Sequence, residues 1–256
     1  DRRIVTIGFR FKGRDVAARP GDSIAAALAV AGESATGTRR SGAARGIFCG
    51  MGVCHDCLVT VNGRRGMRAC MVTAADGMDI WPEDDRRLAE GTVPPDAAPV
   101  RTAEADLAIV GAGPAGLSAA RIAAAAGARV VVLDERTETG GQYFKPRSAV
   151  YRGRPALDRQ HRRGIALRDD AISSGAEIIP DQAVWFVRRA ADGSFDLRSL
   201  GPMQAMRLTA RAVILASGAY ERPAVVPGWT LPGVMTIGAA QTLARRYGVT
   251  PGERVL

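Results

Sequence analysis

Hydrophobic and polar side chains alternate along the first twenty residues, and the alternation is interrupted once. Residues 4–9 and 14–19 flank Lys12 and Gly13, a pattern that predicts a β-hairpin. An apolar run over residues 24–31 follows a proline-glycine turn and predicts a short helix.

Asp22 or Ser23 is expected to cap this helix, because short polar side chains accept hydrogen bonds from the first free N–H groups. A further strand is expected at residues 58–61, where it runs into Asn62 and Gly63. That dipeptide is a strong signal for a second hairpin.

The pattern changes in the middle of the chain. Residues 82–104 are polar and rich in proline, which is typical of a semi-extended linker. Beyond it we expect a buried strand at 105–110, a helix at 117–126, a strand ending at Asp134 and a helix at 157–174. Short strands are expected at 176–179, 183–188, 195–200, 206–209 and 212–215.

The chain has four cysteines, and the first three follow the spacing C-x4-C-x2-C. Loops of plant-type ferredoxins bind a [2Fe-2S] cluster with this spacing. Gly50 and Gly52 lie within the loop, where they can adopt positive φ and place no Cβ against the inorganic sulfides. The predicted cluster ligands are Cys49, Cys54, Cys57 and Cys70.

Zinc and structural disulfides are the alternatives for these cysteines. A zinc site typically combines one C-x2-C with another or with histidines, and only Cys54 and Cys57 have that spacing. A Rieske centre needs two histidine ligands, and His55 is the only histidine nearby. Disulfides suit small secreted domains, and no signal sequence is visible. The spacing favours the cluster, and zinc and disulfides stay open.

A glycine-rich turn containing Gly111, Gly113 and Gly116 connects the strand at 105–110 to a helix. Asp134 follows about 20 positions later at the end of the next strand, which is the context of a dinucleotide-binding fold. Two of the glycines allow the backbone to approach a pyrophosphate, and Gly116 allows the helix to pack on the strand. Asp134 is placed to accept hydrogen bonds from ribose hydroxyls. The motif alone fits NAD as well as FAD.

Composition excludes several other functions. The net charge of +9 comes from scattered arginines with no nucleic-acid module, so nucleic-acid binding is not expected. No apolar run reaches the roughly 18 residues of a membrane span. We expect a cytoplasmic protein, with peripheral attachment at the inner membrane as a variant. Neither His55 nor His161 is assigned a catalytic role, and the catalytic residues are unknown.

Together these motifs resemble the flavoprotein alpha subunits of multi-subunit amine and amino-acid dehydrogenases. The family includes opine oxidases, D-hydroxyproline dehydrogenase, hydrogen cyanide synthase and, more distantly, heterotetrameric sarcosine oxidase. The resemblance covers essentially the whole chain. It rests on the cysteine loop, the glycine turn, Leu133 to Glu135 with Gly140 to Gln142, and the segment from Leu215 to Val234, which is the most specific.

The resemblance implies that the glycine turn binds FAD and that Ser217 lies near the flavin, where relatives usually have threonine. The glycine motif and the resemblance together give these expected FAD-binding residues: Gly111, Gly113, Pro114, Ala115, Gly116, Asp134, Glu135, Gly141, Gln142, Val184, Ser217 and Gly218. In the family a second Rossmann domain begins about where this chain ends, so we interpret the chain as an N-terminal fragment.

The expected fold is an α+β β-grasp ferredoxin-like domain followed by an α/β Rossmann-type FAD-binding domain. The ferredoxin-like domain is assigned to residues 1–81, the linker to 82–104 and the FAD-binding domain to 105–250. Residues 251–256 are assigned to the start of a truncated second dinucleotide-binding domain.

The expected function is electron transfer between FAD and the [2Fe-2S] cluster, within one component of a heteromeric complex. A partner subunit with its own flavin is expected to oxidise the amine or amino acid, and a downstream acceptor to take the electrons. Two alternatives stay open: a self-contained NAD(P)H-dependent reductase, and a non-enzymatic scaffold that carries a cluster.

Overall fold

The computed structural model describes residues 6–39, 41–84, 99–151 and 154–252, and the chain divides into two compact units. Unit 1 takes in the described residues of Asp1–Thr92, Arg147–Arg154 and Glu221–Leu256. Unit 2 takes in those of Val93–Pro146 and Pro155–Tyr220. Each unit has its own sheet and its own hydrophobic core.

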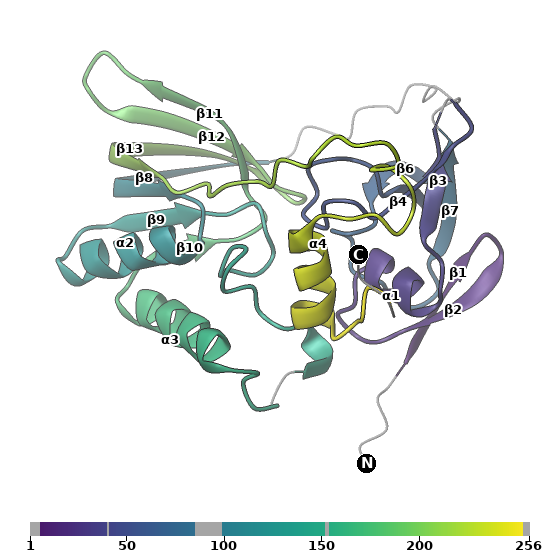
Figure 1. Ribbon diagram of the computed structural model, residues 1–256. Helices are drawn as coiled ribbons and strands as arrows, with labels where there is room; N and C mark the ends of the chain where they lie inside the picture. Colours follow the sequence, from purple (N-terminus) through teal and green to yellow (C-terminus); the bar gives the residue numbers. More distant parts are fainter. Residues whose placement is uncertain (1–5, 40, 85–98, 152–153, 253–256) are drawn as a thin grey trace. The chain divides into compact units, whose positions relative to one another are not determined.

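Unit 1 contains a mixed seven-stranded sheet with a short helix, α1 (Ile24–Val30), packed against it (Figure 1). The strand order is β2-β1-β7-β3-β4, and β5 joins it by pairing with β6 and β7. The strands are β1 (Ile7–Phe11), β2 (Arg14–Ala18), β3 (Ala35–Thr38), β4 (Ala44–Gly46), β5 (Leu58–Val61), β6 (Arg64–Arg68) and β7 (Asp79–Asp84). This arrangement confirms the expected ferredoxin-like fold.

Both predicted hairpins of unit 1 are confirmed. The turn between β1 and β2 has φ of 54° at Lys12 and 76° at Gly13. The turn between β5 and β6 has φ of 49° at Asn62 and 79° at Gly63. Positive φ at both central residues matches the right-handed twist of the strands, which explains why these dipeptides specify tight hairpins.

No strand is expected from the sequence over residues 79–84, and the linker is expected to begin at residue 82. Proline also lacks the N–H donor of a strand pair. The structure nevertheless pairs Pro82 with Val59, and β7 also runs parallel to β1 and β3. Pairing with three neighbours therefore outweighs the local cost of the proline. The expected linker is shorter at both ends, since residues 82–84 belong to β7 and 100–104 to β8; residues 85–98 lie outside the described part.

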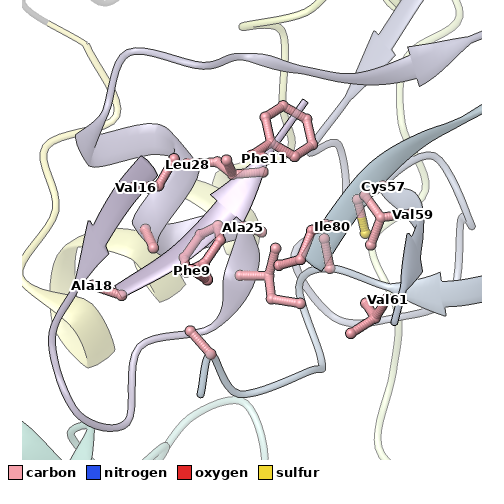
Figure 2. Close-up of a cluster of buried hydrophobic side chains, with 14 of the residues drawn as sticks. Phe9, Phe11, Val16, Ala18, Ala25, Leu28, Cys57, Val59, Val61 and Ile80 are labelled. Carbon is pink, nitrogen blue, oxygen red and sulfur yellow. The ribbon is translucent and has the colours of Figure 1, made fainter. Parts of the chain in front are cut away.

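Two predicted ligands, Cys57 and Cys70, are part of the core of unit 1. Ser23 caps α1 by accepting a hydrogen bond from the Ala26 N–H at 3.1 Å, and Leu28 on this helix is fully buried. Figure 2 shows the Cys57 side chain beside Val59 within the same hydrophobic cluster. The core therefore fixes the position of the Cys57 sulfur.

Unit 2 is a six-stranded sheet in the order β10-β9-β8-β13-β12-β11, with α2 (Pro114–Ala125) and α3 (Arg159–Ser173) on one face (Figure 1). Strands β10, β9, β8 and β13 run parallel to one another. Strand β13 also starts an antiparallel meander with β12 and β11. The strands are β8 (Val100–Val110), β9 (Val130–Leu133), β10 (Glu177–Ile179), β11 (Ala183–Arg189), β12 (Phe195–Leu200) and β13 (Ala205–Leu215). The expected Rossmann-type fold is confirmed, and the strands expected at 206–209 and 212–215 are one continuous strand, β13.

The compact units differ from the expected domain boundaries in one further way. The last described segment, 221–252, belongs to unit 1 although residues 105–250 were assigned to one domain. It contains α4 (Ile237–Gln241) and the π-helical segment η2 (Thr242–Tyr247), neither of which the sequence predicts. Leu243 and Tyr247 bury their side chains against Ala26 of α1.

A short segment of unit 1, residues 147–151, also contacts the C-terminal segment. It contains the 3-10 turn η1 (Ala149–Tyr151), and the Ser148 N–H donates to the Arg246 carbonyl at 3.0 Å. The Arg19 guanidinium donates to the Tyr247 carbonyl at 2.5 Å while it also pairs with Asp22. Residues 251–256 are expected to open a second domain, and all of them beyond residue 252 lie outside the described part.

Two substitutions on α1 test whether burial on this helix stabilises unit 1. Leu28→Ala removes a fully buried side chain and is expected to lower the free energy of unfolding by about 2–5 kcal/mol. Val30→Ala, at a side chain that is 60% exposed, is expected to change it by less than about 0.5 kcal/mol. Chemical denaturation measures both, and equal losses would contradict the packing described here.

Candidate functional site

The four cysteines are free thiols that lie as two pairs in unit 1. The Cys54 thiol hydrogen-bonds to the sulfur of Cys49, which lowers the pKa of Cys49 to about 5 and raises that of Cys54. Cys57 and Cys70 form the second pair, and the same kind of hydrogen bond lowers the pKa of Cys57 and raises that of Cys70. Among the described residues, no three His, Cys, Asp or Glu side chains gather around a single point.

Backbone N–H groups point at the sulfurs of three of these cysteines. Met51 donates to Cys49 and Asp56 donates to Cys54, both at 3.4 Å, and the Cys70 N–H donates to Cys57 at 3.5 Å. Such bonds stabilise thiolates and tune a bound cluster. Gly50 and Gly52 have φ of 61° and 85°, as expected for a loop that curls around its ligands.

Two pairs of thiols with N–H donors fit a binuclear iron-sulfur cluster, since each iron of a [2Fe-2S] centre takes two cysteine ligands. Cys49, Cys57 and Cys70 are buried, and Cys54 is partly exposed. A ligand set that is mostly shielded suits a cluster that must be kept from water.

The described C-terminal segment covers the Cys49 side of the loop within unit 1. Phe48, Cys49 and Met51 form a buried cluster with Trp229 packed against it. The rings of Phe48 and Trp229 meet edge to face, with centroids 5.2 Å apart and an interplanar angle of 72°. This geometry is favoured for aromatic pairs.

Backbone contacts fix this cover in place. The Thr236 N–H donates to the Phe48 carbonyl at 2.9 Å. A Cβ at Gly50 would lie 2.9 Å from the Cα of Ala239, so only glycine allows so close an approach. The Glu221 carboxylate accepts from the Gly238 N–H at 2.9 Å, which holds the two ends of the cover together.

Unit 2 contains a cavity of about 450 Å³ at the carboxyl ends of its parallel strands. This volume lies within the range of small-molecule and cofactor sites. Eleven of the twelve expected FAD-binding residues line it: Gly111, Gly113, Pro114, Ala115, Asp134, Glu135, Gly141, Gln142, Val184, Ser217 and Gly218.

Gly116 is the residue that does not line the cavity. A Cβ at this position would collide with the Gly111 carbonyl and lie 3.3 Å from the Ile109 side chain. Gly116 therefore lets α2 approach β8, which is the packing role expected from the motif.

Asp134 fixes the glycine turn. Its carboxylate is nearly buried and accepts hydrogen bonds from the Ala112 N–H at 2.5 Å and the Arg136 N–H at 2.8 Å. The same side chain lines the cavity. It can therefore accept from a ligand hydroxyl with its remaining lone pairs while it holds the turn.

Two further features fit a bound dinucleotide. Gly113 precedes α2 without a side-chain cap and Pro114 occupies the first turn, so the N–H groups of that turn are available to an anion. Within the part of the chain that the structure describes, the buried Gln142 Nε2 has no hydrogen-bond acceptor, and Gln142 lines the cavity. A ligand acceptor would satisfy this donor.

The cavity also includes residues that the sequence interpretation did not select. Tyr220 donates to Glu135 at 3.3 Å, and burial together with that carboxylate raises the pKa of the Tyr220 phenol. Arg136 and Gln182 also line the cavity. Arg136 directly follows the expected acidic pair, which is the one sequence signal that could have identified it.

Family comparison agrees with these two sites. The 2Fe-2S iron-sulfur cluster binding domain family matches residues 5–84, and the pyridine nucleotide-disulphide oxidoreductase family matches residues 105–251, more than half of the chain. The chain belongs to the pyridine nucleotide-disulphide oxidoreductase family. It is an oxidoreductase chain whose cofactors are FAD and a [2Fe-2S] cluster.

Several relatives confirm the expected resemblance. An opine oxidase subunit from Agrobacterium tumefaciens (strain Ach5) is 39% identical over 59% of this chain and 31% of its own length. The alpha subunit of sarcosine oxidase from Corynebacterium sp. (strain P-1) is 30% identical over 95% of this chain and 27% of its own. The HcnA subunit of hydrogen cyanide synthase from Pseudomonas aeruginosa is 40% identical over 29% of this chain and 71% of its own.

The chain therefore spans about a third of the length of the opine oxidase relatives that it matches. Among solved structures, L-proline dehydrogenase from P. horikoshii matches 98% of this chain and 49% of its own, with a TM-score of 0.78 and 21% identity. At this identity the match shows the shared fold.

Removal of the Trp229 indole tests the cover over Cys49. Trp229→Ala loses an aromatic pair worth about 0.5–1.5 kcal/mol and is expected to speed the loss of cluster absorbance in air, because the Cys49 side becomes accessible to oxygen. Trp185→Ala, at an exposed tryptophan of unit 2, is the matched control. Equal decay rates for the two variants would show that the segment does not protect the cluster.

Proposed function

We propose that this chain is the electron-transferring part of a multi-subunit amine or amino-acid dehydrogenase or oxidase. The observation that carries the proposal is that one chain combines two pairs of thiols in unit 1 with a cofactor-sized cavity at a dinucleotide turn in unit 2. FAD accepts electrons in pairs and releases them singly, and a [2Fe-2S] cluster carries one electron at a time.

Different residues of the chain would hold the two cofactors. Cys49, Cys54, Cys57 and Cys70 would hold the cluster. In unit 2, Asp134 and the N-terminus of α2 would hold the ribose and pyrophosphate of FAD, and Gln142 would donate to an acceptor on the cofactor. Ser217 and Gly218 would lie beside the flavin, as the resemblance implies.

Partner chains follow from the relatives, which are named as subunits of opine oxidase, sarcosine oxidase and hydrogen cyanide synthase. We propose that a partner with its own flavin oxidises an opine, D-hydroxyproline or a similar amine, and that a downstream acceptor takes the electrons. No helix in the described ranges could cross a membrane. A cytoplasmic location, or peripheral attachment at the inner membrane, stays a prediction from the sequence.

A self-contained NAD(P)H-dependent reductase is the second candidate, because the matched family is named for pyridine nucleotides. The two candidates differ in the electron donor. A scaffold without redox function would not need a cofactor-sized cavity lined by Gln142, whose Nε2 has no acceptor among the described residues.

The visible absorption spectrum of protein purified without oxygen tests the proposal. Flavin and iron-sulfur bands that both bleach with dithionite, and that NADH alone leaves unchanged, are the expected result. Bleaching by NADH alone would favour the reductase. A colourless protein that contains zinc would overturn the assignment of the cysteines.

Gly113→Ala tests the flavin site with little effect on folding. Gly113 has φ of −79°, and a Cβ there would lie 3.8 Å from its nearest neighbour, so the fold accepts alanine. The added methyl group at the turn is expected to weaken FAD binding at least about tenfold, measured as flavin per chain after dialysis. Gly8→Ala, with a nearest neighbour also at 3.8 Å, is the control in unit 1. Normal flavin content in Gly113→Ala would place FAD elsewhere.

A further inference from the structure

Arg45 is the largest fully buried side chain among the described residues, with 2% of its surface exposed. It lies on β4, and its guanidinium donates three hydrogen bonds to backbone carbonyls. The acceptors are His55 at 3.3 Å, Asp56 at 3.2 Å and Glu83 at 2.7 Å. His55 and Asp56 are the two residues between Cys54 and Cys57.

Arg45 therefore ties the ligand loop to the sheet. Its planar group spans from the loop to β7, because Glu83 belongs to that strand. A single point charge on a flexible stem could not reproduce this geometry. Without the guanidinium, the carbonyls of His55 and Asp56 would lose a shared donor beside two predicted ligands.

The surrounding strands leave room for this side chain. Gly37 on β3 lies opposite Arg45 in the strand register. A Cβ at Gly37 would collide with the Glu83 carbonyl that accepts from Arg45, and would lie 3.1 Å from two guanidinium nitrogens, a tight contact. The sequence therefore uses a glycine where the arginine passes across the sheet.

Arg45 places its positive charge beside the loop. The loop carries one acidic side chain, Asp56. Arg39 donates to the same carboxylate at 2.6 Å. A buried positive charge is poorly screened by water and salt, so it acts on neighbouring groups more strongly than an exposed one.

We propose that Arg45 is a positioning residue that also raises the reduction potential of the [2Fe-2S] cluster. The proposal rests on the proposed function, in which Cys49, Cys54, Cys57 and Cys70 hold that cluster. One-electron reduction adds a negative charge to a centre already surrounded by thiolates. A positive charge buried beside the loop stabilises the reduced form, which makes reduction easier.

The test compares substitutions that separate charge from hydrogen bonding. Arg45→Lys keeps the charge, whereas Arg45→Gln keeps amide donors and loses the charge. Arg68→Gln is the matched control, because Arg68 also donates to a loop carbonyl, that of Gly52 at 2.8 Å, but is exposed. The measurement is the midpoint potential of the cluster, followed by absorbance or electron paramagnetic resonance in an anaerobic redox titration of the full chain.

The expected result is a lower potential in Arg45→Gln, a potential close to that of the unaltered chain in Arg45→Lys, and a smaller shift in Arg68→Gln. Equal potentials in all loaded variants, with losses only in cluster content or thermal stability, would show that Arg45 is merely structural and would overturn the proposal.

Asp56→Asn supplies a second test if Arg45→Gln takes up no cluster. Loss of this carboxylate leaves the charge beside the loop less neutralised and is expected to raise the potential. An unchanged or lower potential in Asp56→Asn would overturn the electrostatic role. Iron and sulfide analysis of the unaltered chain separates failure of the Arg45 proposal from failure of the proposed function. Absence of a cluster in the unaltered chain refutes the proposed function itself.

Discussion

The conformation of the cysteine loop is the constraint on which the rest of unit 1 depends. The stretch from Cys49 to Cys57 has no regular secondary structure, so bonds from outside must hold its thiols in place. Arg45 binds its carbonyls from the sheet side, and the segment around Trp229 and Thr236 packs on the side of Cys49. Cys57 is anchored in the hydrophobic core. A loop held in this way loses little conformational freedom when it takes up a cofactor, which favours binding.

Unit 2 fixes the conformation of its glycine turn in a different way. The parallel strands β8 and β9 end at one edge of the sheet, where a turn rich in glycine exposes N–H groups at the start of α2. Asp134 holds this turn from the end of the neighbouring strand through the Ala112 N–H. The site thus consists mainly of backbone, and a small number of side chains determine its shape. This explains why the motif is recognisable in sequence, since only particular residues permit the backbone geometry.

The predictable features were those with local causes. The hairpins at Lys12-Gly13 and Asn62-Gly63 follow from residues that adopt positive φ, and the glycine turn follows from close backbone approach. The features that were missed depend on contacts between distant residues. Pro82 joins a strand because three neighbours pair with β7, and residues 221–252 join unit 1 because Leu243, Tyr247 and Trp229 find apolar surface there. Arg45 gave no signal, because nothing in the sequence distinguishes a buried arginine from the many exposed ones.

The most direct test of the central claim, that one chain converts paired electrons into single ones, is a count of the electrons it accepts. In an anaerobic titration with dithionite, the account predicts about three electron equivalents per chain, about two at the flavin and about one at the cluster. Uptake of about two equivalents with only flavin bleaching, or of about one with only iron-sulfur bleaching, would contradict it.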